Sequence, residues 1–196
     1  MWIDPKLYID YHKLDNILKR IQNVLLNYPI EKLHEIGSNW FPEKDDCATF
    51  SIILHKKDII IECINTETEK IIHDIQKLSG INQCLINFIK AGDPIPDHTD
   101  GREYYDKKDN IHEEKIKALE NIHFSKDTYQ IILGIQIPSN NPDIVGFHVN
   151  NEIRGYNTGD IVAFDGNVMH GGWNYSNEYR ITACLDIDKK SFQNVD

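Results

Sequence analysis

Short apolar stretches separated by turn residues fill the chain from residue 82 onward, and this pattern restricts the fold more than any other feature. The separators are rich in Gly, Pro, Asn and Asp, as at 92–94, 140–143 and 165–167. Many short strands with regular turn signals are typical of an antiparallel sandwich or barrel. The apolar stretches cover residues 84–90, 129–138, 144–149, 153–156, 160–164, 168–174 and 179–187.

The first 80 residues have a mixed pattern. Apolar side chains recur at helical spacing over residues 13–27 and again over 67–78, which predicts two helices. Residues 51–54 and 58–64 predict two strands around a charged turn. Residues 30–50 have no clear period and predict an irregular connection. We therefore expect a mainly β protein with N-terminal helices.

The length suits one domain, because a chain of 196 residues can bury roughly 70% of the surface that its unfolded form exposes. We expect residues 1–196 to form a single domain. Within it, residues 1–80 would be a supporting N-terminal part and residues 81–190 a β core. A charged stretch at 101–127 breaks the rhythm of the strands and predicts an insertion into that core.

Composition excludes several classes of protein. The 21 Lys and Arg against 31 Asp and Glu give a net charge of -10, which disfavours nucleic acid and anionic membranes as partners. No apolar run approaches the ~18 residues of a membrane span, and the N-terminus lacks the layout of a secretory signal. The four cysteines are far apart and predict reduced, mostly buried thiols. We expect a soluble cytoplasmic protein.

Three side chains form a candidate metal site. His98 and Asp100 stand two positions apart, so on an extended backbone both point to the same face. His170 can supply a third ligand. Two His and one carboxylate on one face of a metal leave other positions open, as in non-haem Fe(II) oxygenases.

A cation follows the distal histidine by ten residues. Arg180, with Thr182 two positions later, is suited to bidentate capture of a carboxylate. This implies a dicarboxylate cosubstrate whose 2-oxo acid end reaches the iron, namely 2-oxoglutarate. The alternative makes His170 an ordinary loop histidine and Arg180 a surface ion-pair partner.

Residues 84–188 resemble the aspartyl/asparaginyl β-hydroxylase family of 2-oxoglutarate oxygenases. The resemblance implies a double-stranded β-helix (a jelly roll, cupin-like), with His98 and His170 as iron ligands and Arg180 on the far carboxylate of 2-oxoglutarate. The stretches that carry it are LINFIKAG (85–92), IPDHTD (95–100), LGIQIP (133–138), NEIRGY (151–156), GDIVAFD (159–165), His170, WN (173–174), Arg180 and LDI (185–187).

The sequence departs from the family pattern at two places. Asp100 completes the metal triad, whereas animal members of the family have Gly at that position. Before Leu133 the family places a basic residue and a His, and this chain has Gln130 and Ile132. Gln130 can still donate a hydrogen bond, so we expect it to help Thr182 and Arg180 hold the cosubstrate.

Five further side chains are candidates for substrate contact. Arg102, Tyr104 and Tyr105 begin the 101–127 insertion directly after the metal motif, which predicts a lid over the substrate. Trp173 and His148 lie near the motif strands. The alternatives are loop packing for the first three, packing beneath the site for Trp173, and an ordinary hydrogen-bonded strand histidine for His148.

These observations predict an Fe(II)- and 2-oxoglutarate-dependent dioxygenase. With O2 it would hydroxylate an unactivated C–H bond of an amino acid, a peptidyl residue or a small metabolite. The main alternative is a cupin-like metal-binding or sensing protein without catalytic turnover, and a weaker one is a purely structural interaction domain without metal. We expect a small-molecule or peptide partner, and the sequence leaves the oligomeric state open.

Overall fold

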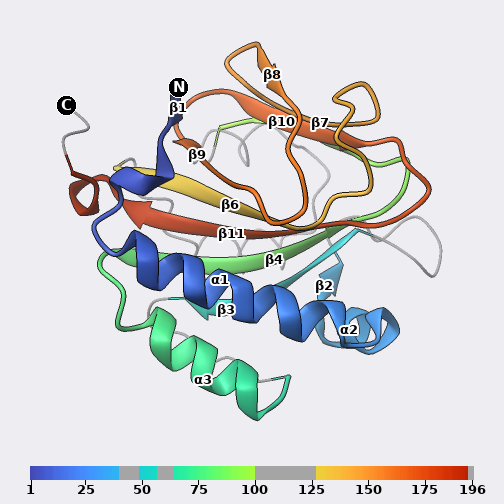
Figure 1. The fold of residues 1–196 in the computed structure, drawn as a ribbon. Helices are drawn as coiled ribbons and strands as arrows, with labels where there is room; N and C mark the ends of the chain where they lie inside the picture. The colour runs from blue at the N-terminus through green and yellow to red at the C-terminus, as the bar shows by residue number, and fades with distance from the viewer. Residues whose placement is uncertain (40–48, 57–63, 100–126, 194–196) are drawn as a thin grey trace, which may run out of the picture.

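The computed structural model describes residues 1–39, 49–56, 64–99 and 127–193, which form three helices and two antiparallel sheets (Figure 1). The large sheet has the order β1-β9-β6-β11-β4-β3-β2, and the small sheet has the order β5-β10-β7-β8. The strands of the large sheet are β1 (Trp2–Ile3), β2 (Ser38–Asn39), β3 (Phe50–Lys56), β4 (Ile81–Ile89), β6 (Thr128–Gln136), β9 (Ile161–Asp165) and β11 (Arg180–Asp188). Those of the small sheet are β5 (Pro94–His98), β7 (Val145–Val149), β8 (Glu152–Arg154) and β10 (His170–Asn174).

From β4 to β11 the chain passes back and forth between the two sheets. Strands β4, β6, β9 and β11 belong to the large sheet, and β5, β7, β8 and β10 belong to the small one. This alternation is that of a double-stranded β-helix, or jelly roll. The mainly β fold that the sequence predicts is therefore confirmed.

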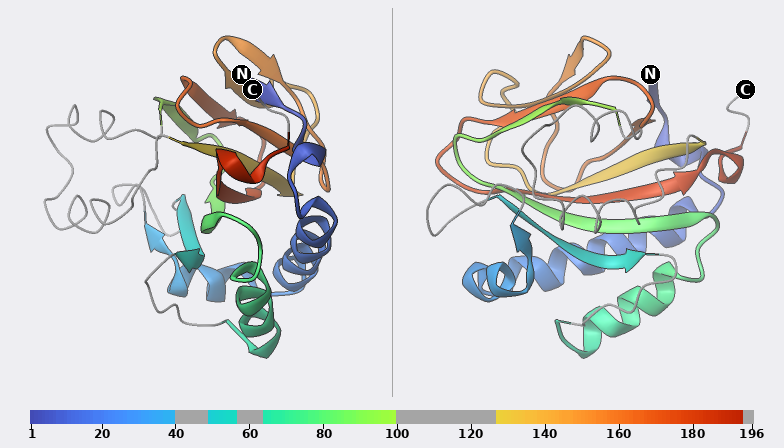
Figure 2. Two further views of the ribbon diagram at one scale, coloured as in Figure 1. Left: turned by 90° about the vertical axis from the view of Figure 1, so that its left-hand side faces the viewer. Right: turned by 180° about the vertical axis from the view of Figure 1, so that it is seen from behind.

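Three helices cover the other face of the large sheet: α1 (Tyr11–Leu26), α2 (Ile30–Ile36) and α3 (Thr66–Ile75). Figure 2 shows them on one side of this sheet and the small sheet on the other. The predicted helices at 13–27 and 67–78 correspond to α1 and α3. The prediction of an irregular connection from residue 30 was wrong at its start, because Pro29 caps the short helix α2. The predicted strand at 58–64 lies almost entirely outside the described residues.

Strand β11 shows that the two faces of the large sheet pack against different layers. Successive residues of a strand point to opposite faces. Ile181, Ala183, Leu185 and Ile187 belong to the main hydrophobic core, together with the buried face of α1. Arg180, Thr182, Cys184 and Asp186 alternate with them and face the small sheet. A second, smaller core lies on that side around Phe147, Tyr156 and Phe164.

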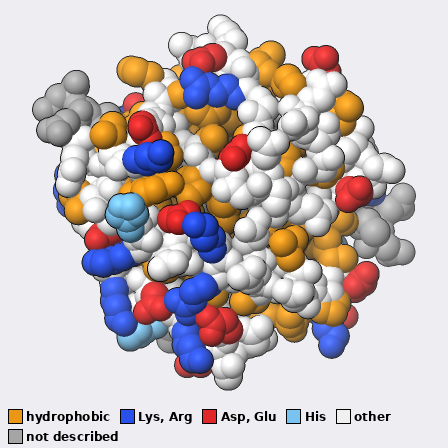
Figure 3. Space-filling model, viewed as in Figure 1, with side chains coloured by type: hydrophobic (Ala, Val, Ile, Leu, Met, Phe, Trp, Pro, Cys, Tyr) orange, Lys and Arg blue, Asp and Glu red, His pale blue; other side chains and the backbone are white. Residues whose placement is uncertain are grey.

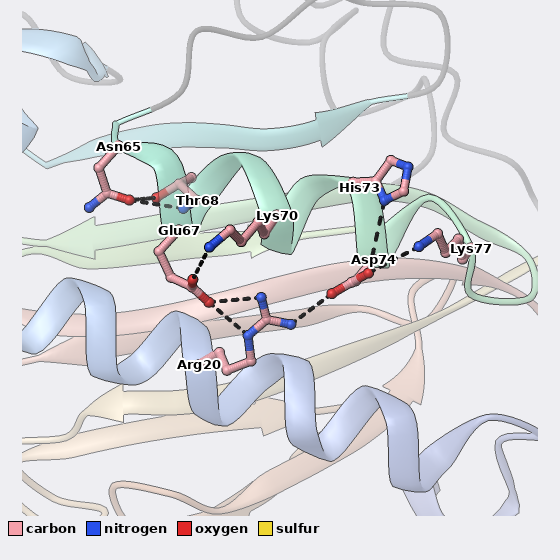
Figure 4. Close-up of polar contacts among 8 residues, drawn as sticks. All are labelled: Arg20, Asn65, Glu67, Thr68, Lys70, His73, Asp74 and Lys77. Atoms are coloured by element: carbon pink, nitrogen blue, oxygen red, sulfur yellow. Dashed lines mark hydrogen bonds and ion pairs between the residues drawn. The ribbon is translucent and has the colours of Figure 1, made fainter.

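Helices α1 and α3 are joined by one arginine (Figure 4). The Arg20 guanidinium of α1 donates to Glu67 at 2.8 and 2.9 Å and to Asp74 at 2.8 Å, both on α3. Hydrogen bonds from Arg20 and Lys77 hold the pKa of Asp74 below its ordinary value. On the face shown in Figure 3, acidic and basic side chains intermingle over the helices. None of the described helices has the length and apolar character needed to span a bilayer.

Replacing Arg20 by Met should lower the melting temperature by about 1–3 °C at pH 7, because the partly exposed pairs contribute little each. Since the pKa of Asp74 is depressed in the folded state, this contribution exists above the ordinary Asp pKa near ~4 and is lost as the pH falls. Thermal unfolding at pH 7 and at acidic pH measures both effects. Lys13→Met is the control, since the ion pair of Lys13 among the described residues is with Asp10, directly before its own helix. A difference that grows toward acidic pH would contradict this account.

Candidate functional site

Two histidines meet on the interior side of the small sheet. His98 ends β5 and His170 begins β10, and the two residues are directly opposed in the ladder between these strands. Opposed residues project to the same face of a sheet. Their ring centroids are 4.4 Å apart, and only 2% of the surface of His170 is exposed.

Backbone carbonyls fix the orientation of both imidazole rings. The Nδ1 atom of His98 lies 2.7 Å from the carbonyl oxygen of Pro96, and that of His170 lies 2.8 Å from the carbonyl of Val168. A carbonyl can only accept, so each Nδ1 carries the hydrogen and each neutral ring has its lone pair on Nε2. This is the second interaction that metal-ligating histidines commonly make.

Aromatic rings form one wall beside His170. The ring centroids of Phe164 and Phe147 lie 4.9 and 5.9 Å from that of His170. An apolar shell of this kind limits access of water to a metal site. The third predicted ligand, Asp100, lies outside the described residues, as do Arg102, Tyr104, Tyr105 and nearly all of the predicted 101–127 lid.

Arg180 is buried at the start of β11, with 1% of its surface exposed. Its Nε and Nη2 atoms both donate to the phenol oxygen of Tyr156, at 3.0 and 2.6 Å. Its Nη1 atom donates to the carbonyl oxygen of Gly146 at 3.3 Å. The sequence alternative of a surface ion-pair arginine therefore does not hold.

The positive charge of Arg180 is not neutralised by the described part of the chain, where no carboxylate lies within ion-pair distance of it. Burial raises the pKa of Tyr156, although Arg180 opposes this, so the phenol is neutral at pH 7. A buried cation without a counter-ion is destabilising by several kcal/mol. The interior is therefore suited to an anionic ligand.

Glycines make room for this arginine and its tyrosine. A Cβ atom at Gly172 would lie 2.8 Å from Nη1 of Arg180 and 3.0 Å from Phe147. A Cβ atom at Gly134 would lie 3.2 Å from the ring of Tyr156 and 2.6 Å from a backbone oxygen. A side chain at Gly172 would press on the guanidinium, and one at Gly134 would press on the backbone of Asn157 and on the phenol ring.

One ring connects the cation and the histidine pair. The centroid of Phe147 lies 5.7 Å from Cζ of Arg180 and 5.9 Å from the ring centroid of His170. The two groups thus flank the same side chain inside the β-helix.

The predicted helpers Thr182 and Gln130 face the same interior. Thr182 is buried two residues after Arg180, and its hydroxyl lies 3.6 Å from Sγ of Cys184. Gln130 is opposed to Asp186 on β11 and to Phe164 on β9. Of the predicted reduced thiols, Cys84 is free and buried and Cys184 is free and partly buried, and desolvation raises the pKa of Cys184 to about 11.

His148 and Trp173 are not brought to this interior. On β7, His148 lies between Phe147 and Val149, which face the inner core, so its own side chain faces outward. Trp173 occupies the outward position on β10, and the two rings stack with centroids 6.3 Å apart. His148 instead bonds Asp97, which also points outward.

Sequence reasoning missed Tyr156, Gly146 and Asn87. Tyr156 and Gly146 hold Arg180, and the Nδ2 atom of Asn87 donates to Sγ of Cys184 at 3.3 Å on the inner face of β4. Tyr156 stands at the end of the stretch NEIRGY, which the family resemblance already included. No spacing rule connects that stretch with Arg180, which is 24 residues away.

The sequence matches the profile of a known protein family. The profile of the family described as aspartyl/asparaginyl beta-hydroxylase matches residues 61–190, well over half of the chain. The chain belongs to this family. The predicted resemblance is thereby confirmed, and the match includes all eight strands of the β-helix with both histidines and Arg180.

Solved structures are similar in fold. An oxidoreductase of the 2OG-Fe(II) oxygenase family from Burkholderia pseudomallei has 12% identity and a TM-score of 0.50, covering 90% of this chain and 80% of its own. AviO1 from Streptomyces viridochromogenes Tue57 also has 12% identity and a TM-score of 0.50, covering 88% and 84%. No curated protein matches the sequence. At this identity the likeness concerns the fold alone.

Replacing Tyr156 by Phe should destabilise the protein by about 1–3 kcal/mol, because two donors of a buried cation lose their acceptor. Urea denaturation measures the change. Tyr175→Phe is a matched control, since Tyr175 is 61% exposed. Equal stability of the two variants would show that the phenol oxygen does not hold Arg180.

Proposed function

We propose that the protein is an Fe(II)- and 2-oxoglutarate-dependent dioxygenase that hydroxylates an unactivated C–H bond. One observation carries the proposal: a buried guanidinium without a carboxylate partner in the described chain shares the ring of Phe147 with a pair of oriented histidines. The family match supports the same reading. The histidines fit a metal and the guanidinium fits an anion, so the residues present suit both groups.

The residues have separate tasks in this function. His98 and His170 would hold iron through their Nε2 atoms, with Asp100 as the expected third ligand. Iron, when bound, would activate O2, and the oxidative decarboxylation of 2-oxoglutarate to succinate and CO2 would supply two of the four electrons that O2 accepts, the other two coming from the C–H bond. Arg180 would bind the far carboxylate of 2-oxoglutarate.

The surrounding residues orient these groups. Tyr156 and the Gly146 carbonyl fix the guanidinium plane before the cosubstrate enters, which reduces the ordering required on binding. Phe147 and Phe164 limit water near His170. Thr182 and Gln130 are the proposed neutral helpers on the carboxylate and the chain of the cosubstrate.

The substrate would be an amino acid, a peptidyl residue or a small metabolite. Arg102, Tyr104 and Tyr105 remain the proposed contacts from the insertion, and a cytoplasmic location remains part of the proposal. Screening free amino acids and peptides for stimulated succinate release, with iron and ascorbate present, tests the function directly. Absence of any 2-oxoglutarate turnover under these conditions would refute it.

A second function deserves a test because the histidine pair alone supports it. A cupin-like metal-binding or sensing protein would keep the triad of His98, Asp100 and His170, but Arg180 would have no cosubstrate role. Such a protein would bind metal without forming succinate from 2-oxoglutarate. The succinate assay therefore separates the two functions.

Replacing His98 or His170 by Ala should abolish tight Fe(II) binding, because each change removes one of three proposed protein ligands. Asp100→Ala should retain some iron, since relatives have Gly there. Anaerobic titration with metal analysis measures the occupancy. His12→Ala is the control, because His12 is exposed on α1. Full occupancy in both histidine variants would remove the assigned metal site.

Replacing Arg180 by Met should weaken 2-oxoglutarate binding by about 10- to 100-fold while iron binding persists, because a charge-assisted contact is lost. The same change should leave the ligand-free stability unchanged or raise it, since it removes an uncompensated buried charge. Calorimetry with 2-oxoglutarate and urea denaturation test the two parts. Strong destabilisation with unaltered 2-oxoglutarate affinity would make Arg180 a structural residue.

A further inference from the structure

A histidine and an aspartate meet on the outer face of the small sheet. His148 of β7 and Asp97 of β5 bond through Nε2 and Oδ1 at 2.8 Å. Strand β10 runs between β7 and β5 and pairs with both. The two side chains therefore reach over β10, the strand that begins with His170.

Strand β10, which lies between the two residues, allows their contact only because it has a glycine at the crossing point. Gly171 of β10 is opposed to His148 in the ladder. A Cβ atom at Gly171 would lie 2.6 Å from Oδ1 of Asp97 and 2.9 Å from Nε2 of His148. Any other residue would separate the pair, so the bond across the strand depends on this glycine.

The strand that carries His98 has a weak backbone ladder. Among the described strands, β5 is at the edge of the small sheet and pairs with β10 alone, with an irregularity between His170 and Gly172. Two of its five residues, Pro94 and Pro96, have no N–H group to donate. A side-chain bond to β7 supplies a connection that this ladder lacks.

The histidine of the pair is itself held in place. Its ring stacks on Trp173 with an interplanar angle of 24°. The indole Nε1 of Trp173 donates to the carbonyl oxygen of Pro142 at 2.7 Å. The indole lies where Gly146 has no side chain, since a Cβ atom there would overlap the ring. The orientation of His148 is thus fixed, and its hydrogen bond can in turn fix Asp97.

We infer that His148 and Asp97 form a positioning pair for the metal site, an inference that rests on the proposed function. Asp97 and His98 are neighbours on β5 and point to opposite faces, so fixing Asp97 outside fixes the direction of His98 inside. The bond holds β5 in the register in which His98 opposes His170. Neither residue of the pair touches the metal or the cosubstrate.

The test measures Co(II) affinity, with Co(II) as a spectroscopic substitute for Fe(II), on the full chain without 2-oxoglutarate. His148→Leu and Asp97→Ala break the bond. His148→Gln and Asp97→Asn keep it, because a glutamine amide donates from a position similar to Nε2 and an asparagine oxygen accepts. Glu152→Gln is the control, since it alters the exposed Glu152–Arg154 pair on β8 of the same sheet.

We expect the two disruptive variants to lose about tenfold in Co(II) affinity, the lower end for residues that orient a metal ligand, because Asp97 is largely exposed. They should also alter the visible spectrum of bound Co(II). The two conservative variants and Glu152→Gln should bind as wild type does. Melting temperatures of the ligand-free proteins, within a few degrees of that of Glu152→Gln, would show that the fold persists.

Three results would overturn the inference. The first is wild-type Co(II) affinity and spectrum in His148→Leu and Asp97→Ala. The second is a loss that the conservative variants share, because the bond would then not be its cause. The third is an equal loss of Co(II) affinity in the Glu152→Gln control, which would indicate a general effect of surface charge. Failure of the wild-type protein to bind Co(II) or Fe(II) would instead refute the proposed function.

Discussion

The buried guanidinium of Arg180 is the interaction on which the interior of this protein depends. A cation in a low-dielectric interior loses its hydration, and a neutral phenol with one carbonyl replaces only part of it. Gly172 and Gly134 stand where side chains would displace this group or its tyrosine. A fold that made no use of the charge would be more stable with an apolar residue there. Under the proposed function, this loss of stability would be offset when the carboxylate of 2-oxoglutarate binds.

The protein can have this polar interior because the large sheet carries the main hydrophobic core on its opposite face. Its strand β11 presents alternate residues to two layers, and the apolar ones pack under the helices. The main core thus lies on the side away from the site and provides the stability that the interior lacks. Helices α1 and α3 of the N-terminal third contribute to this core and are joined to each other through Arg20. This separation allows the inner face to hold Arg180, Thr182 and Asn87 without loss of the fold.

The sequence predicted those parts of the fold and site that depend on local patterns. Turn residues between apolar stretches predicted the strands, and helical spacing predicted α1 and α3. Helix α2 was missed because seven residues are too few to establish a period. His98, His170 and Arg180 could be selected because their chemistry and spacing are visible along the chain.

The remaining site residues depend on distant neighbours. Tyr156 becomes significant only because it contacts Arg180, and that contact is made by folding rather than by spacing. The directions of His148 and Trp173 follow from which face of their strands is buried, and a short strand gives little indication of that. His148 is a candidate for substrate contact by its residue type, but its strand position directs it outward, and the alternative of a hydrogen-bonded strand histidine is the one that the structure supports.

The burial of Arg180 also bears on which keto acid the proposed enzyme would use. A 2-oxo acid without a second carboxylate could still reach the histidine pair, but it would leave the guanidinium desolvated and unpaired. A site built around a buried charged group discriminates strongly against ligands that lack the partner, because the group then remains unsatisfied. The methyl or hydrogen of a shorter acid cannot take the place of a carboxylate beside Tyr156 and Phe147. Selectivity of the proposed enzyme for a dicarboxylate would therefore follow from the same desolvation that makes an unpaired Arg180 unfavourable.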